Sequence, residues 1–154
     1  MLQEFSYLAP TTLKDLYATL KKNAGKAVIL AGGTDLLVEL HNNWIAPKLL
    51  VDIKKIPQLN GISFDRKTGL SIGATTVCFD LINNKDVQKH YPLLADAAGR
   101  IGSRQLRNRA TIGGNLCTAS PCADMGCSLL ALGAQVELAS VDGVRVIDLK
   151  DYFT

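Results

Sequence analysis

Apolar residues in the first third of the chain follow two different spacings. One set recurs at helical spacing behind a threonine that can cap a helix, with a glycine as the stop. Its members are Leu13, Leu16, Tyr17 and Leu20, with Thr11 or Thr12 as the cap and Gly25 as the stop. Residues 27–31 are continuously apolar, which predicts a strand buried on both faces. A short helix at 36–40 and a strand at 49–53 would complete a β-α-β unit.

Farther along the chain, the pattern predicts antiparallel strands and more helices. Residues 61–76 alternate between apolar and polar side chains around a turn at 66–69, which is typical of short antiparallel strands. Segments 135–139 and 144–147 flank Val141-Asp142-Gly143 and predict a hairpin with an Asp-Gly turn. Helices are predicted at 78–83, 93–106 and 128–132, and a glycine-rich loop at 111–116. We therefore predict an α+β fold.

Length and composition indicate one domain that spans residues 1–154. A chain of 154 residues, 47% of them hydrophobic, can bury a sizeable core. The net charge of +3 is small for this length, so no nucleic-acid binding is implied. The longest apolar stretches are far shorter than the roughly 20 residues of a membrane helix, so we expect no membrane insertion. The N-terminus lacks the pattern of a secretory signal, which favours a cytoplasmic location.

The segment Ala31-Gly32-Gly33-Thr34-Asp35 places consecutive backbone N–H groups between a strand and a helix start. Glycine permits an anion such as phosphate to approach these groups closely. The alternative is that the glycines serve only a tight turn. The segment has neither the lysine of a Walker motif nor the glycine spacing of a dinucleotide fingerprint, which disfavours a Rossmann site.

A second glycine segment, Thr111-Ile112-Gly113-Gly114-Asn115, concentrates a hydroxyl, two glycines and an amide. Such a cluster can hold a diphosphate. No acidic residue lies between Asp96 and Asp124, whereas this window contains Arg100, Arg104, Arg107 and Arg109. The local field should therefore be positive and favour an anionic ligand. The alternative for each arginine is a solvated position on a helix face.

Three segments together resemble a known family. They are Ile29 to Leu36, Arg107 to Asn115, and Ala119-Ser120-Pro121-Cys122-Ala123-Asp124. In this order and spacing they resemble the FAD-binding subunit of the molybdopterin hydroxylase family, which includes xanthine, nicotinate and carbon monoxide dehydrogenases. The similarity runs from the N-terminal region to the end of the chain, and the ordered set is more specific than either glycine segment alone.

The resemblance implies a two-lobed FAD-binding domain of the vanillyl-alcohol oxidase type (PCMH-type), with FAD in the cleft between the lobes. The first segment would wrap the diphosphate and ribityl, with backbone N–H groups and the Thr34 hydroxyl as donors. Its residues are Ile29, Leu30, Ala31, Gly32, Gly33, Thr34, Asp35 and Leu36. The other implied contacts are Thr111, Gly113, Gly114 and Asn115 on the opposite side, Thr118 and Asp124 beside the cofactor, and Ile101 and Gly102 at an apolar wall. For Ile101 the alternative is a place in the core.

In this family a molybdopterin-binding large subunit hydroxylates the substrate and an iron-sulfur small subunit relays the electrons. The flavin delivers them to an acceptor, often a nicotinamide dinucleotide. The resemblance implies an electron-transfer module. From the residues themselves we expect no catalytic base and no metal site. The family's flavin subunit continues into a C-terminal domain, which we expect to be missing here or carried by a separate chain. The alternative functions are a non-catalytic assembly module that has lost FAD and, ranked last, a stand-alone flavin reductase.

Cysteines 117, 122 and 127 form a C-x4-C-x4-C series, which raises the question of a metal or iron-sulfur site. Zinc sites favour closer pairs combined with a second pair or histidines, and bacterial cluster runs use two-residue gaps. We therefore expect Cys117, Cys122 and Cys127 to be buried thiols packed near the flavin. Cys78 has no neighbouring cysteine in sequence and is expected to be a small core residue.

Overall fold

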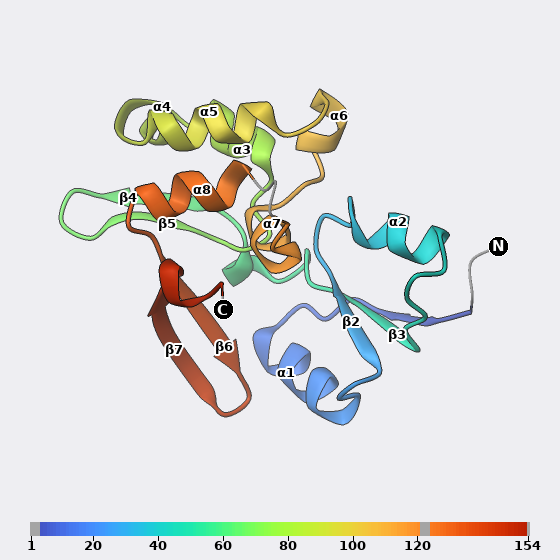
Figure 1. The fold of residues 1–154 in the computed structure, drawn as a ribbon. Coiled ribbons are helices and arrows are strands. Elements are labelled where there is room, and N and C mark those ends of the chain that lie inside the picture. The colour runs from blue at the N-terminus through green and yellow to red at the C-terminus, as the bar shows by residue number, and fades with distance from the viewer. Residues whose placement is uncertain (1–3, 121–123, 154) are drawn as a thin grey trace.

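The computed structural model describes residues 4–120 and 124–153 (Figure 1). Its buried hydrophobic residues form two separate cores. The smaller core is formed by Leu16, Leu49, Val51, Ile53 and Ile56, all from the first 60 residues. The larger core begins at Cys78 and includes residues as far along as Leu149. Two separate cores in one chain of this length place a boundary between two groups of elements. The predicted cofactor contacts come from both groups, residues 29–36 from the first and residues 101–124 from the second.

The first group is a three-stranded parallel sheet with helices packed beside it. It comprises β1 (Ser6–Leu8), α1 (Leu13–Lys22), β2 (Ala27–Leu30), α2 (Leu36–His41), β3 (Leu49–Asp52) and the 3-10 helix η1 (Pro57–Leu59). The strand order is β1-β3-β2, and β2 pairs with β3 in the register Ala27 to Leu49. The predicted β-α-β unit is confirmed. So is the predicted cap of α1, because the Thr12 side chain accepts a hydrogen bond from the Asp15 backbone N–H.

Two features of this sheet differ from prediction. Strand β1 was not predicted. The expectation that residues 27–31 are buried on both faces is wrong, since Ile29 in β2 is 46% exposed. The reason lies in the strand order: β2 is at the sheet edge, whereas every residue of the central strand β3 is buried.

The second group combines two antiparallel hairpins with helices. It comprises β4 (Ile62–Asp65), β5 (Gly69–Ile72), α3 (Cys78–Asn83), α4 (Lys85–His90), α5 (Pro92–Arg100), α6 (Arg104–Arg107), α7 (Ile112–Thr118), α8 (Asp124–Ala131), β6 (Gln135–Ser140), β7 (Gly143–Asp148) and the 3-10 helix η2 (Leu149–Asp151). Both predicted hairpins are confirmed. The mixture of helices and strands agrees with the predicted fold class.

The helices of this group differ from prediction in four places. The helix predicted at 93–106 is interrupted between α5 and α6, where Gly102 has a φ of +38°. The loop predicted at 111–116 is instead the start of helix α7, which Thr111 caps by accepting a hydrogen bond from the Gly114 N–H at 3.1 Å. Helix α4 was not predicted, and α8 begins at Asp124, ahead of the predicted start at residue 128.

Helix α7 lies at the centre of the molecule, between the β2–α2 segment and α8 (Figure 1). Backbone bonds attach its start to the chain that follows β5: the Ile112 N–H donates to the Thr76 carbonyl, and the Gly113 N–H to the Ala74 carbonyl. Within residues 4–120 and 124–153, none of the helices has the length and apolar character needed to cross a membrane.

Candidate functional site

The two glycine segments meet in the folded chain. Gly32 is buried, and a side-chain Cβ at this position would lie 2.1 Å from the backbone oxygen of Arg109 and 3.2 Å from the Cα of Ala110. No real side chain tolerates such a distance, so the backbone after β2 and the backbone before α7 touch only because residue 32 is a glycine. This contact joins two parts of the chain that are far apart in sequence.

A second contact joins the same two regions. The hydroxyl of Thr118, the last residue of α7, donates a hydrogen bond of 3.2 Å to Oδ2 of Asp35. Asp35 is the residue before α2, and its side chain does not cap that helix. Residues from both predicted motifs therefore lie side by side.

The first glycine segment carries a run of unused hydrogen-bond donors. In the described part of the chain, the amide N–H groups of Gly32, Gly33, Thr34, Asp35 and Leu36 donate no hydrogen bond. Gly33 has a φ of +78°, a conformation that side-chain-bearing residues rarely adopt. Gly32 is buried, and Gly33, Thr34 and Leu36 are half-buried. Because buried N–H groups are normally paired, such a run is typical of an anion-binding backbone.

The second glycine segment is organised differently. The N–H groups of Ile112 and Gly113 donate to carbonyls of the Ala74–Thr76 chain, and those of Gly114 and Asn115 donate to Thr111. This segment therefore has no run of free donors like that of the first segment. Its backbone is used to start α7, and its glycines serve close packing instead: a Cβ at Gly113 would lie 2.7 Å from the Ala74 oxygen.

One side-chain atom in the second segment lacks a partner. Oδ1 of Asn115 is buried and accepts no hydrogen bond from any described residue. A buried polar atom left without a partner costs about 1–3 kcal/mol. The folded chain therefore holds an unused acceptor in α7, the helix that contacts the first glycine segment.

The remaining predicted contacts lie on adjoining elements. Ile101 and Gly102 form the turn between α5 and α6, and the Arg107 guanidinium donates to both of their carbonyls at 2.9 Å. Ile101 is half-buried and packs against the larger core, which agrees with the alternative given for this residue. Asp124 is the first residue of α8.

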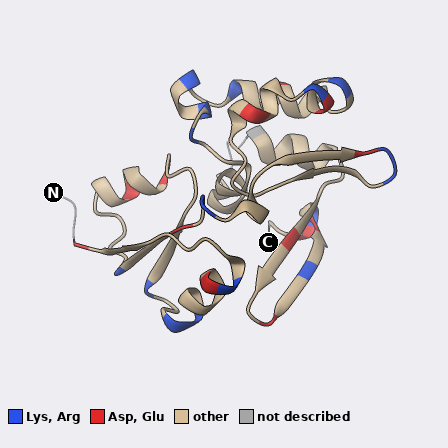
Figure 2. Ribbon diagram, turned by 180° about the vertical axis from the view of Figure 1, so that it is seen from behind, with Lys and Arg blue, Asp and Glu red and all other residues tan. Residues whose placement is uncertain are grey.

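The arginines of the acid-free window are mostly engaged elsewhere. Arg100 pairs with Asp96 at 2.9 Å, Arg104 lies 5.7 Å from the Phe79 ring centroid, and Arg107 holds the Ile101–Gly102 turn. Figure 2 shows charged residues mainly on the outer helices and turns, whereas α7 at the centre has none. The donors for an anion at this site are thus chiefly backbone N–H groups.

Three polar residues near the first segment were not predicted. The ammonium of Lys54 donates to the Ala31 carbonyl at 3.0 Å and pairs with Asp52 at 2.8 Å, and Tyr7 donates to Asp52 at 2.6 Å. Burial raises the pKa of Asp52, but hydrogen bonds from Lys54 and Tyr7 outweigh it and hold that pKa below its ordinary value. The one feature of the sequence that could have indicated this cluster is Asp52, an aspartate at the end of an otherwise apolar strand.

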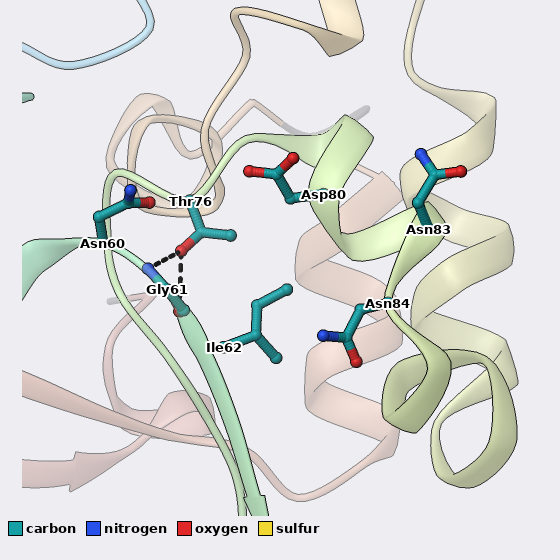
Figure 3. Close-up of a pocket in the computed structure, with 7 residues that line it drawn as sticks. All are labelled: Asn60, Gly61, Ile62, Thr76, Asp80, Asn83 and Asn84. Carbon is teal, nitrogen blue, oxygen red and sulfur yellow. Dashed lines mark hydrogen bonds between the residues drawn. The ribbon is translucent and has the colours of Figure 1, made fainter.

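An open pocket of about 350 Å³ lies elsewhere, beside β4 and α3 (Figure 3). Its lining residues are Asn60, Gly61, Ile62, Thr76, Asp80, Asn83 and Asn84. Thr76 both donates to and accepts from the Gly61 backbone at 3.0 Å. The predicted site residues are not among those that line this pocket.

The cysteines are arranged differently from the prediction. Cys117 and Cys127 are exposed, so the expectation of buried thiols is wrong for both, and Cys122 lies outside the described residues. The Tyr152 hydroxyl lies 3.7 Å from Sγ of Cys117, and burial followed by this contact raises the pKa of Tyr152 to about 12. In the part of the chain that the structure describes, no three His, Cys, Asp or Glu residues gather as potential metal ligands.

Cys78 is a core residue, as predicted, and burial raises the pKa of its thiol to about 11. At about pH 8 we expect iodoacetamide to label the exposed Cys117 and Cys127 while Cys78 stays unmodified, because the thiolate is the nucleophile and burial disfavours the thiolate of Cys78. Adding denaturant should expose Cys78 and allow its labelling. Peptide mass spectrometry gives the readout, and equal labelling of Cys78 and Cys117 in the native protein would contradict the buried position.

Comparison with known proteins extends these observations. The family described as "FAD binding domain in molybdopterin dehydrogenase" matches residues 3–154. The nicotinate dehydrogenase FAD-subunit of Eubacterium barkeri is 38% identical over 154 residues, which cover 99% of this chain and 51% of that protein. The xanthine dehydrogenase FAD-binding subunit of Escherichia coli O157:H7 is 37% identical over 149 residues, covering 97% of this chain and 51% of that protein.

A solved structure agrees with the sequence comparison. The carbon monoxide dehydrogenase of Hydrogenophaga pseudoflava, in a form that lacks the Mo-pyranopterin moiety of its cofactor, superposes with a TM-score of 0.96 at 36% identity. The superposition covers all of this chain and 53% of that one. The chain thus spans about half the length of the relatives it matches. From the family match over nearly its whole length, the chain belongs to the FAD-binding domains of molybdopterin dehydrogenases.

Proposed function

We propose that this chain binds FAD and acts as the electron-transfer module of a molybdenum-containing hydroxylase or dehydrogenase complex. The observation that carries the proposal is the run of unused N–H groups from Gly32 to Leu36, next to a second segment that supplies close packing and an unpaired acceptor. Family membership gives FAD as the ligand for which such a site is suited.

The chemistry of the described residues fits this cofactor. Consecutive free backbone donors suit the two phosphates of FAD. Asn115 offers an acceptor, which the hydroxyl groups of FAD can satisfy. We infer that FAD lies between two lobes built on the two cores, in the PCMH-type arrangement. Its contacts would be residues 29–36 on one side and Ile101, Gly102, Thr111, Gly113, Gly114, Asn115, Thr118 and Asp124 on the other.

When bound, FAD supplies the redox chemistry, whereas the chain binds and orients it. In our proposal, electrons come from an iron-sulfur small subunit and originate at a molybdopterin-binding large subunit. They leave toward an acceptor such as NAD(P).

Titration of the purified chain with FAD tests the central proposal. Binding should quench flavin fluorescence, saturate at one FAD per chain and give a yellow protein after gel filtration. A chain that remains colourless and leaves flavin fluorescence unchanged at saturating concentrations would contradict the proposal. That result would favour a non-catalytic assembly module of the same fold.

Replacing Asn115 should change the stability of the protein and its FAD affinity in opposite directions. Replacing Asn115 with leucine, which has a similar size, removes a buried acceptor without a partner and should raise the unfolding free energy of the FAD-free protein by about 1 kcal/mol. The same change should weaken FAD binding, because the acceptor is lost. Thermal unfolding and FAD titration measure the two effects. Asn42 is exposed and serves as the control, since Asn42→Leu should change neither the unfolding free energy nor the FAD affinity. A destabilised Asn115→Leu protein with normal FAD affinity would contradict the role of Asn115 as a ligand-facing acceptor.

A further inference from the structure

A buried carboxylate beside the first glycine segment is held from several directions. Asp52 at the end of β3 is 6% exposed, and its Oδ2 accepts a hydrogen bond of 2.6 Å from the Tyr7 hydroxyl. Its Oδ1 lies 2.8 Å from Nζ of Lys54 and accepts the Lys54 backbone N–H at 3.0 Å. Both carboxylate oxygens have partners, so the Asp52 carboxylate is held in place and in turn holds the Lys54 ammonium.

Lys54 connects the Asp52 carboxylate to the first glycine segment. Its ammonium donates a hydrogen bond of 3.0 Å to the carbonyl oxygen of Ala31. That oxygen belongs to the same planar peptide unit as the N–H of Gly32. The described chain has no cis peptide bond, so the oxygen and the amide hydrogen point in opposite directions. Holding the Ala31 oxygen on one side therefore aims the Gly32 N–H toward the other.

The same peptide unit is restrained at Gly32 itself. The Cα of Gly32 packs against the Arg109 backbone so closely that a Cβ would meet its oxygen at 2.1 Å. The peptide thus cannot rotate freely, and its N–H is the first of the unused donors. A cation on the carbonyl oxygen also polarises the amide, which strengthens the N–H as a donor to an anion.

We propose that Tyr7, Asp52 and Lys54 form a positioning relay that orients the Ala31–Gly32 peptide and presents the Gly32 N–H to the anionic part of the ligand. Lys54 acts through this peptide and does not itself touch the ligand. The inference rests on the proposed FAD site and adds to it residues that lie outside both glycine segments.

The test compares two adjacent lysines. Lys54→Met removes the relay, whereas Lys55→Met removes one positive charge from an exposed neighbour and leaves the relay intact. We expect Lys54→Met to raise the Kd for FAD about tenfold, the lower end of the effect of outer-shell partners at metal sites. Lys55→Met should change the Kd less than about twofold, and Lys54→Arg, which keeps a charged donor, should restore much of the affinity. Equal Kd values for the two methionine variants would overturn the relay.

A second measurement separates failure of the relay from failure of the FAD proposal. In the FAD-free protein, the backbone 15N–1H resonance of Gly32 reports polarisation of its peptide, and it should shift in Lys54→Met but not in Lys55→Met. If the wild-type chain does not bind FAD, the proposed function fails. The Gly32 resonance still shows whether Lys54 polarises the Ala31–Gly32 peptide. An unmoved Gly32 resonance in Lys54→Met overturns the relay. Tyr7→Phe, which keeps the Lys54–Asp52 pair, provides a milder variant should Lys54→Met fold poorly, and a smaller shift in the same direction is expected.

Discussion

Replacing Gly32 with alanine should reduce FAD affinity by about 100-fold or more. The added Cβ would lie 2.1 Å from the Arg109 oxygen, and that neighbour is backbone, which cannot turn aside as a flexible side chain would. Overpacking of this kind costs about 3 kcal/mol, which corresponds to roughly 100-fold in a binding constant. The FAD-free chain can relieve the strain by moving the first glycine segment away from residues 109–110. Binding has to reverse that movement, so the loss appears in the Kd measured by flavin titration.

Gly99 provides the matched control for Gly32→Ala. It lies within α5 and has an ordinary φ, and a Cβ added there would have no atom within 4 Å apart from its chain neighbours and the backbone of its own helix. Gly99→Ala should therefore leave FAD affinity unchanged and stabilise the protein by up to about 1 kcal/mol, since alanine favours helix. Near-normal FAD affinity in Gly32→Ala, with the control behaving as expected, would show that contact between the two glycine segments is not required for the site.

Local patterns in the sequence were sufficient for elements whose structure depends on neighbours in sequence. The Thr12 cap of α1, the β2-α2-β3 unit and both hairpins follow from spacing, capping and turn residues. The exposure of Ile29 could not be predicted in this way, because it depends on which strand occupies the sheet edge. Burial of a strand is a property of the sheet order and not of the strand alone.

The start of α7 shows a different limit. Gly113 and Gly114 each cost about 1 kcal/mol in a helix relative to alanine, so the sequence favours a loop. The structure compensates with the Thr111 cap and with hydrogen bonds from Ile112 and Gly113 to the chain after β5. These last partners are distant in sequence, and tertiary contacts of that kind override local propensity.

The residues of the candidate site could be predicted from the sequence, but the different roles of the two glycine segments could not. Both glycine segments were identified from sequence, and the structure places Gly32 against Arg109 and Asp35 beside Thr118. That the run of consecutive free N–H groups lies in the first segment depends on hydrogen bonds that no motif encodes. Lys54 reaches the Ala31 carbonyl across a parallel strand pair, and this contact has no signature in sequence.

The chain loaded with FAD but without partners should give no sustained oxidation of a purine, nicotinate or aldehyde substrate. Its four cysteines contain no C-x4-C-x2-C pattern of a plant-type cluster, so these 154 residues supply no relay from an organic substrate to the flavin. Adding a molybdenum subunit and an iron-sulfur subunit should restore turnover from zero. The assay is dye reduction by the complex, isolated under mild conditions through a tag on this chain, with its subunits identified by mass spectrometry.

A Gly32→Ala variant of that complex tests whether electrons leave the complex through the FAD of this chain. If the flavin of this chain is the exit for electrons, the variant should retain reduction of the iron-sulfur centres by substrate but lose reduction of NAD(P), because the path is interrupted after the clusters. Gly99→Ala should leave both steps intact. Substrate turnover by the chain alone would overturn the electron-transfer assignment. Undiminished NAD(P) reduction by a Gly32→Ala complex that contains no flavin would place the exit on another subunit.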